Sequence, residues 1–366
     1  MLSVGIIGLP NVGKSSVFNA LTAGHADVSN YPFTTIEPNF GMVAVPDERL
    51  AELARLLEPE EAAPCFIRFI DIAGLVEGAS RGEGLGNQFL GEIRQVDAVA
   101  QVVRCFPASD VAHVFAEVDP RRDVEVIETE LMLADLEVLS RAIDKRKRDW
   151  ATRPREFADE RRRLELYRQT LEAGRSLSTL ELDAEDQREL KVLGLLTGKP
   201  MLLVANVAEE GYGQGPSPEG ERLREGRAAA GAPEQVVEVS AKIEWELAQL
   251  EPEERREFMA ELGLERTGLE RLVGGCFELL GLIRFYTIAH RKLRAWELRS
   301  GACAPEAAGK IHTDMEHGFI RAQVTSYAQL AEHGSFHELH RHGLLRTEGK
   351  DYVIADGDVV EFLFSS

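Results

Sequence analysis

Cysteine is scarce in this chain, and its four cysteines lie far apart. Cys65, Cys105, Cys276 and Cys303 form no CxxC pair, which argues against a disulfide framework or a zinc site and favours reduced thiols. The sequence also lacks any apolar run near the ~20 residues that span a bilayer. Its N-terminus enters a strand-like segment at once, without a basic leader. These absences together predict a cytoplasmic protein.

Positive charge is also in deficit. The 366 residues include 62 Asp and Glu but 42 Lys and Arg, which gives a formal net charge of −20. Such a molecule repels polyanions, so general binding of RNA, DNA or anionic lipid is not expected and any such contact must use a local basic patch. The composition, 44% hydrophobic and 28% charged, is that of an ordinary globular protein, and the length predicts two or three folding units.

A complete phosphate-binding motif is present at Gly8 to Ser15, which read GLPNVGKS and match GxxxxGK[ST]. It follows the apolar run Val4 to Ile7 and precedes the helical stretch Ser16 to Leu21. A strand, a tight turn and a helix N-terminus bring several backbone N–H groups around one anion. Lys14 is expected to reach the β- and γ-phosphates, and Ser15 to offer its hydroxyl to Mg²⁺. The nucleotide-binding residues expected in this loop are Gly8, Asn11, Val12, Gly13, Lys14, Ser15 and Ser16.

The sequence DIAG, Asp71 to Gly74, ends a second apolar run. This order predicts Asp71 beside the Mg²⁺ through a water molecule and the Gly74 amide near the γ-phosphate. Upstream, NYPFTTIEPN carries two threonines, and Thr35 is favoured over Thr34 as the hydroxyl that closes on Mg²⁺ when the γ-phosphate is present. The motifs therefore predict a magnesium-dependent nucleoside triphosphate site, in which Lys14, Thr35 and Gly74 act on the reacting phosphate.

The motif for the base departs from the guanine-specific form NKxD, because Asn206 to Glu209 read NVAE. Glu209 adds a methylene where an Asp accepts two hydrogen bonds from guanine, and Val207 lacks the Lys stem that packs on the base. A lost charged hydrogen bond is worth about 1.5–3 kcal/mol, or roughly tenfold to a hundredfold in affinity, so adenine can compete. The residues expected around the purine are Asn206, Val207 through its backbone, Glu209, and Ser240 and Ala241, since the sequence SAK is expected to supply a backbone edge for the base.

No glutamine follows DIAG to orient the attacking water. Leu75 stands there, and because leucine neither donates nor accepts a hydrogen bond, unaided turnover below about one per second is expected. His113 is the candidate for positioning the water, and a structural role is the alternative. Asn11 is a candidate for holding K⁺ near the phosphates, the alternative being a hydrogen bond that stabilises the loop.

The pattern along the chain predicts an α/β fold with a mostly parallel, Rossmann-like sheet. Apolar runs at Val4 to Ile7, Phe66 to Asp71, Ala98 to Arg104 and Pro200 to Asn206 are separated by helical stretches such as Asp47 to Leu57. Residues 123–194 have few turn residues and predict two antiparallel helices. Their apolar positions, spaced by three, four or seven, are Met132, Leu136, Leu139, Ile143, Phe157, Leu164 and Leu171.

A small α+β module is predicted at the C-terminal end. Its expected strands are Arg284 to Ile288, Phe319 to Val324, Asp351 to Ile354 and Val359 to Phe364, with a short helix after Pro305. The predicted boundaries are 1–124 and 195–278 for a discontinuous nucleotide-binding domain, 125–194 for the inserted helical arm and 279–366 for the C-terminal domain.

These motifs together resemble those of the YchF/Obg-like ATPases. The shared sequences are GLPNVGKS, NYPFTTIEPN, DIAGLV with GASRGEGLGNQFL, and NVAE, the last of which separates the ATPase branch from the broader Obg group of GTPases. The segments APEAAGKIHTDMEHGFIRAQV and EGKDYVIADGDVVEFLF resemble the C-terminal TGS module, which is β-grasp-like. The resemblance covers nearly the full chain. It implies a G domain interrupted by a helical arm, hydrolysis of ATP in preference to GTP, Mg²⁺ at Ser15 and Thr35, and association with the ribosome.

Local positive charge gathers toward the tip of the predicted arm. The sequence RAIDKRKR at Arg141 to Arg148, with Arg153, Arg155 and residues 161–163, is a candidate contact for RNA phosphates. Acidic residues interleave, so a solvated helix with intrahelical ion pairs is the alternative. Two other functional hypotheses stay open: a GTP-specific ribosome-assembly GTPase, and a nucleotide-binding module without significant hydrolysis.

Overall fold

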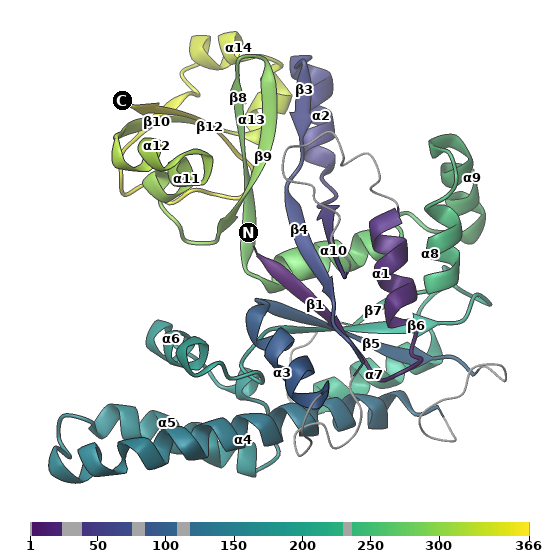
Figure 1. Ribbon diagram of the computed structural model, residues 1–366. Helices are drawn as coiled ribbons and strands as arrows, with labels where there is room; N and C mark the ends of the chain where they lie inside the picture. The colour runs from purple at the N-terminus through teal and green to yellow at the C-terminus, as the bar shows by residue number, and fades with distance from the viewer. Residues whose placement is uncertain (1, 24–38, 75–84, 108–117, 230–235, 366) are drawn as a thin grey trace. The chain divides into compact units, whose positions relative to one another are not determined.

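The computed structural model describes residues 2–23, 39–74, 85–107, 118–229 and 236–365 (Figure 1). The chain forms two compact units. One unit comprises Met1–Met42 with Arg68–Cys276, and the other comprises Val43–Ile67 with Phe277–Ser366. Each unit has its own buried hydrophobic cluster.

The first unit is built on a sheet whose strands are β1 (Ser3–Ile7), β2 (Phe40–Ala44), β4 (Phe66–Asp71), β5 (Ala98–Cys105), β6 (Met201–Val207) and β7 (Val236–Val239). Their order is β2-β4-β1-β5-β6-β7, and the strands from β4 to β7 pair in parallel. All residues of β1 and β5 are buried, because a parallel sheet has both faces covered. The predicted parallel α/β sheet is therefore confirmed.

Nine helices of this unit lie within the described residues. They are α1 (Lys14–Ala23), α3 (Leu85–Gln95), α4 (Pro120–Thr152), α5 (Ala158–Glu172), α6 (Ala184–Leu193), α7 (Pro218–Ala229), α8 (Ala241–Leu247), α9 (Pro252–Leu262) and α10 (Gly268–Leu279), of which the last runs on past the unit boundary. A short 3₁₀ turn spans Leu177–Thr179. Val103, Leu203 and Ala205 from the sheet form one hydrophobic cluster with Val124 of α4 and Leu247 of α8.

The inserted arm consists of α4 and α5, which lie side by side in Figure 1. The carboxylate of Asp119 caps α4 by accepting the N–H groups of Arg121 and Arg122, and Pro120 fits the first turn because it needs no hydrogen-bond acceptor there. The helix ends at Thr152. All seven predicted apolar positions belong to one cluster, so the helical periodicity is confirmed.

Helix α6 and a buried anchor on the arm helix α4 were not predicted from the sequence. Asp135 of α4 is completely buried, and its carboxylate accepts the N–H of Leu196 at 2.8 Å, the N–H of Thr197 at 2.8 Å and the Thr197 hydroxyl at 2.7 Å. Burial raises the pKa of Asp135, while these hydrogen bonds oppose that shift. The carboxylate thus joins the arm to the chain that leads into β6.

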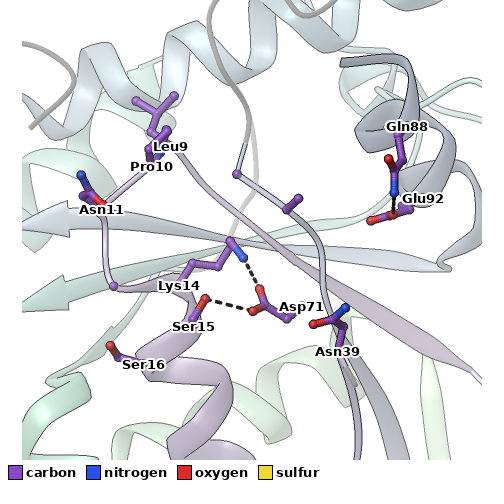
Figure 2. A pocket seen from close by; sticks show the side chains of 13 residues that line it. Leu9, Pro10, Asn11, Lys14, Ser15, Ser16, Asn39, Asp71, Gln88 and Glu92 are labelled. Atoms are coloured by element: carbon purple, nitrogen blue, oxygen red, sulfur yellow. Dashed lines mark hydrogen bonds and ion pairs between the residues drawn. The ribbon is translucent and has the colours of Figure 1, made fainter. Parts of the chain in front are cut away.

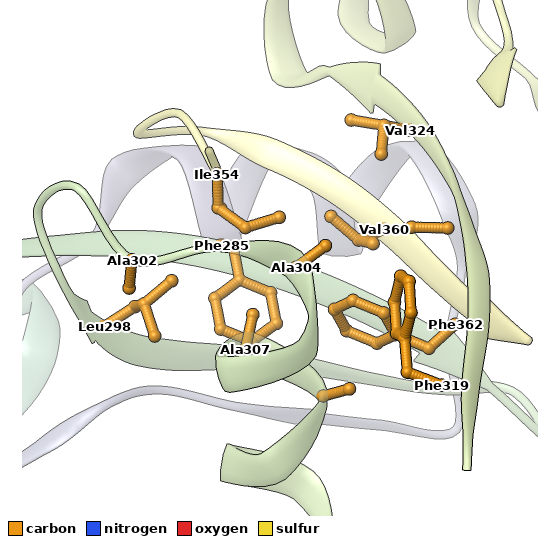
Figure 3. Close-up of a cluster of buried hydrophobic side chains, with 12 residues drawn as sticks. Phe285, Leu298, Ala302, Ala304, Ala307, Phe319, Val324, Ile354, Val360 and Phe362 are labelled. Atoms are coloured by element: carbon orange, nitrogen blue, oxygen red, sulfur yellow. The ribbon is translucent and has the colours of Figure 1, made fainter. Parts of the chain in front are cut away.

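The second unit is an α+β unit with a mixed sheet. Its strands are β3 (Glu61–Ala63), β8 (Leu282–Ala289), β9 (Lys292–Arg299), β10 (Phe319–Ser326), β11 (Arg346–Glu348) and β12 (Asp358–Phe364), in the order β11-β10-β12-β8-β9-β3. Its helices are α2 (Glu48–Leu57), α11 (Ala304–Ile311), α12 (Thr313–His317), α13 (Tyr327–His333) and α14 (Phe336–Arg341). Phe285, Phe319 and Phe362 form the centre of its core, with edge-to-face ring centroids 6.0 and 6.2 Å apart (Figure 3).

Two expectations need correction in this unit. Residues 43–67, which the sequence analysis assigned to the nucleotide-binding domain, group with the C-terminal residues, because β3 pairs with β9 and Tyr286 donates its hydroxyl to Asp47. The segment Asp351 to Ile354 is not a strand, since its backbone makes one isolated bridge, between Val353 and Cys303. The other details of the predicted domain boundaries stay a prediction.

All four cysteines are free thiols, as predicted, and three of them are buried. Among the residues that the structure describes, no helix has the length and apolar character needed to cross a membrane.

Candidate functional site

The loop between β1 and α1 has the backbone that its glycines and Asn11 allow. Asn11 and Gly13 take positive φ angles of 62° and 89°. A side chain at Gly13 would place its Cβ 2.2 Å from Asn206 Nδ2, and one at Gly8 would place it 2.7 Å from the carbonyl oxygen of Val102. Glycine is therefore required at both positions, because the loop turns sharply against neighbouring chain.

A cavity of about 640 Å³ opens over this loop (Figure 2). It lies at the carboxyl ends of the parallel strands β1 and β4, where α/β sheets commonly bind ligands. Seven of its lining residues come from the loop and the start of α1, and the others from β4, the chain after it, Asn39 and α3. They are Leu9, Pro10, Asn11, Gly13, Lys14, Ser15, Ser16, Asn39, Asp71, Ala73, Gly74, Gln88 and Glu92.

Three polar side chains converge in this cavity. Figure 2 shows Lys14 and Ser15 directed at the two oxygens of Asp71. Lys14 Nζ donates to one carboxylate oxygen, and Ser15 Oγ donates to the other at 3.0 Å. The ammonium group, the hydroxyl and the carboxylate thus interact with one another through side chains. A bound phosphate could take the place of these side-chain partners.

DIAG lies against the phosphate loop. The Asp71 N–H donates to the Asn39 carbonyl at 2.8 Å, and Ile72 N–H donates to the Ile6 carbonyl at 3.1 Å. A Cβ on Gly74 would be 3.5 Å from the carbonyl oxygen of Gly8. The segment after β4 is therefore fixed to β1, and the Gly74 backbone borders the cavity.

The base motif is joined to the same loop through one buried amide. Asn206, at 3% exposure, donates from Nδ2 to the Val12 carbonyl at 2.9 Å and accepts the Ala241 N–H on Oδ1 at 3.2 Å. Ser240 is buried and precedes the first turn of α8. The Asn206 side chain thus ties three of the predicted motifs into one structure.

The other two residues of the base motif lie differently from each other. Val207 is buried in the hydrophobic cluster behind β6. Glu209 is exposed, and both of its oxygens accept from Lys242 Nζ at 2.8 Å. This hydrogen bond raises the pKa of Lys242. Only the backbone of SAK was predicted to lie near the base, so the ion pair between Glu209 of NVAE and Lys242 of SAK was missed.

Some predicted residues lie outside the described residues. Thr35, its alternative Thr34, Leu75 and His113 fall in ranges that the structure does not describe, and their roles stay predictions. Conversely, Asn39, Gln88 and Glu92 line the cavity without having been predicted as site residues. Gln88 and Glu92 are four residues apart on α3 and share a hydrogen bond of 3.2 Å, a spacing that indicates one helix face.

Magnesium fits the donor set at Asp71 and Ser15, since hydroxyl and carboxylate oxygens are the hard ligands that Mg²⁺ prefers. Within the described ranges, His, Cys, Asp and Glu side chains form no cluster of three or more that could hold a metal unaided. A cation at this site would therefore rely on phosphate oxygens for further ligands.

Two family models match the chain. One, described as a 50S ribosome-binding GTPase, matches residues 3–133, and the other, for the C-terminal part of YchF GTPases and described as a protein of unknown function, matches residues 282–365.

Curated proteins similar to the chain include the ribosome-binding ATPase YchF of Escherichia coli O157:H7, which is 46% identical over 361 residues, covering 99% of this chain and 98% of that protein. The protein of the same name from Bacillus subtilis is 44% identical over 365 residues, covering 100% and 99%.

Solved structures agree with these matches. The structure of the Schizosaccharomyces pombe YchF GTPase has a TM-score of 0.90 at 31% identity, covering 99% of this chain and 97% of that one. A GTP-binding protein from Pyrococcus horikoshii, 19% identical with a TM-score of 0.62, shares the fold.

Proposed function

The chain belongs to the YchF family, and from that premise we propose that it is a ribosome-associated ATPase that hydrolyses ATP to ADP and phosphate and accepts GTP more weakly. One observation carries the proposal: Lys14, Ser15 and Asp71 converge in a cavity over a complete phosphate loop. Relatives that cover the whole chain carry the name ribosome-binding ATPase. Hydrolysis would switch the protein between two states in a cytoplasmic cycle on the ribosome.

In the proposed reaction, the loop amides and Lys14 stabilise the negative charge that develops on the transferring phosphoryl group. Asp71, acting through a water molecule, and the hydroxyls of Ser15 and Thr35 would hold Mg²⁺. When bound, that ion neutralises charge between the β- and γ-phosphates. Gly74 would report the presence of the γ-phosphate, and Asn11 is the predicted residue for K⁺.

Selection of adenine is attributed to the base motif. Asn206 shapes the loop by bonding Val12 and Ala241, and Glu209 is engaged by Lys242 rather than standing free for guanine. The Val207 backbone, Ser240 and Ala241 complete the predicted purine contact. Because Leu75 offers no hydrogen bond to water, slow intrinsic turnover is expected, with His113 proposed as the positioning group.

Contact with ribosomal RNA is proposed at the arm tip. Several of its cations form ion pairs within the arm, such as Arg146 with Glu160. Lys145, Arg148 and Arg155, in contrast, are exposed and make no ion pair with any residue that the structure describes. These three charges are available to phosphates, and each contact should add to the salt dependence of binding.

A single-turnover measurement of phosphate release from radiolabelled ATP tests the hydrolysis. We expect Lys14→Ala to slow release by at least about a hundredfold, because the lysine stabilises the transition state. Lys191→Ala removes an exposed lysine of the same unit and should leave the rate unchanged. No release above the Lys14→Ala level, even with ribosomes present, would identify a nucleotide-binding module instead.

A GTP-specific enzyme is the second candidate, favoured by the GTPase description of the matching family model. Calorimetric titration decides between the two, since GTP binding about tenfold tighter than ATP would replace the ATPase proposal.

Co-sedimentation with ribosomal subunits across a salt series tests the partner. Replacing Lys145, Arg148 and Arg155 by Ala should weaken binding and flatten its salt dependence. The matched set Arg188, Lys191 and Arg222, also exposed, should have little effect when replaced by Ala. Equal losses in both sets would argue against an RNA contact at the tip.

A further inference from the structure

A second large concavity lies away from the phosphate loop, between α8 and α9. It has a volume of about 610 Å³. Its apolar lining is Leu250 and Phe258, which are half-buried and pack against the hydrophobic cluster of the first unit. The floor of this α8/α9 groove is therefore part of the packed core and has a fixed shape.

Four carboxylates surround the apolar floor: Glu246, Glu254, Glu257 and Glu261. All four are exposed, and none makes an ion pair with any residue that the structure describes. Glu254, Glu257 and Glu261 share one face of α9 with Phe258, since they lie three, four or seven residues apart. The groove thus combines an apolar floor with a rim of one charge sign.

The arginines of α9 do not neutralise this rim. Arg255 pairs with Glu270 at 3.8 Å, and Arg256 pairs with Glu253 at 3.9 Å. Both arginines of α9 therefore pair with glutamates that do not line the groove. The rim glutamates thus form no ion pair with any described residue, in contrast to the glutamates of the arm, where intrahelical pairs are frequent.

An exposed aromatic residue lies four positions before a residue of the groove lining. Trp245 of α8 is 43% exposed, and its carbonyl accepts a hydrogen bond from Gln249, a residue of the groove lining. Exposed tryptophans are frequent anchors of protein interfaces, because the ring combines a large apolar area with one polar N–H.

We propose that the α8/α9 groove is the docking surface for a basic, amphipathic helical segment of a protein partner. The apolar face of such a helix fits Leu250 and Phe258, and its Lys and Arg residues complement the carboxylate rim. The same rim repels phosphates, so this surface differs from the arm tip proposed for RNA. Peptide binding to this surface can be measured without ATP, so a failure of the docking proposal is distinguishable from a failure of the ATPase proposal.

Fluorescence anisotropy with a labelled 18-residue peptide of Leu and Lys, arranged with helical period, tests the proposal on the full chain. We expect the triple variant Glu254→Gln, Glu257→Gln and Glu261→Gln to weaken binding about tenfold at ~0.1 M salt. The matched triple Glu181→Gln, Glu221→Gln and Glu225→Gln carries the same charge change on exposed positions of the first unit and should stay within about twofold. Circular dichroism confirms that both triples remain folded.

Several outcomes would overturn the proposal. Equal weakening by both triples would mean that the peptide follows total charge alone. A scrambled peptide of the same composition that binds as well as the periodic one would show that the apolar floor is not used. A concentration-dependent dimer of the free protein that the groove triple abolishes would assign the surface to a second copy of the chain.

Discussion

Two aspartates of the first unit, Asp71 in the phosphate cavity and Asp135 on the arm helix α4, differ in the kind of partner that bonds them. Asp71 is bonded by the side chains of Lys14 and Ser15 at the edge of a large cavity. Asp135 is fully buried and is bonded by two backbone N–H groups and a hydroxyl. Side-chain partners can turn toward a ligand, whereas buried backbone donors have no other acceptor. The difference separates a carboxylate that can exchange partners from one that fixes the fold.

Removing each carboxylate in turn tests this contrast most severely. Asp135→Ala should lower the free energy of unfolding by about 3–5 kcal/mol, because it leaves buried donors unpaired. Asp71→Ala should cost less than about 1 kcal/mol, since Lys14 and Ser15 can turn to water. Urea unfolding of the full chain, followed by circular dichroism, measures both, and equal losses would refute the contrast.

Nucleotide binding measures whether Asp71 exchanges its side-chain partners for a bound ligand. Asp71→Asn should weaken binding of magnesium-ATP by about tenfold, because it removes the charge that is expected to hold Mg²⁺. Binding of ATP in EDTA should be unchanged or stronger, since Lys14 no longer has to leave a carboxylate. Titration of a fluorescent ATP analogue with and without Mg²⁺ gives the two affinities, and a parallel fall in both would contradict the assignment.

A third carboxylate, Glu209, extends this comparison of partners to the residues expected to contact the base. Its partner Lys242 is an exposed side chain, so it can turn away from Glu209 to water, as the partners of Asp71 can turn away from Asp71. Glu209→Asp shortens the reach to Lys242 and restores the guanine-type carboxylate, so the preference for ATP over GTP should fall by about fivefold. Calorimetry with both nucleotides checks this, and Lys242→Met, which frees the carboxylate without shortening it, is the companion variant. An unchanged ratio in both would remove Glu209 from base selection.

Asp356 of the second unit is an intermediate case. It accepts the backbone N–H of Arg284 at 2.8 Å and the Arg49 guanidinium at 2.8 Å, and it is about half exposed. Partial burial raises its pKa, but the hydrogen bonds from Arg49 and Arg284 outweigh that and lower it below its usual value. The stabilisation is therefore present above the unfolded pKa of about 3.9 and is lost as pH falls through the lower folded value.

Asp356→Asn should accordingly cost about 1 kcal/mol or less at pH 7, after allowance for solvent screening. The difference from the wild type should shrink as the pH falls below about 4. Thermal unfolding across a pH series measures it, with the exposed Asp351→Asn as the control. A difference in stability between variant and wild type that grows toward low pH would contradict a lowered pKa for Asp356.

Much of the nucleotide site could be predicted, because its parts are local in sequence. The spacing of Gly8, Gly13 and Lys14 requires a strand, a turn and a helix, and the structure has β1, the loop and α1 in that order. The arm was predicted as well, since seven apolar positions repeat with a helical period and all of them meet in one cluster. Each of these signals depends on residues a few positions apart.

Pairings between distant residues could not be predicted in this way. The strand β3 joins β9 across more than two hundred residues, which moves residues 43–67 into the second unit. Likewise, Lys242 meets Glu209, and the α8/α9 groove forms only when two short helices pack on a shared core. Single sequences carry no direct signal for such contacts, because many pairings satisfy the same apolar pattern.

The sequence by itself determined that this protein has a phosphate loop, a DIAG segment, a parallel sheet and a helical arm, because glycine freedom, residue spacing and hydrophobic period act over a few residues. Tertiary structure alone decided which unit residues 43–67 join, that Asp135 is a buried anchor while Asp71 faces a cavity, and that unpaired glutamates surround an apolar floor. The physical reason is that burial and the choice of partner belong to the packed chain, whereas backbone conformation is already restricted by each short segment.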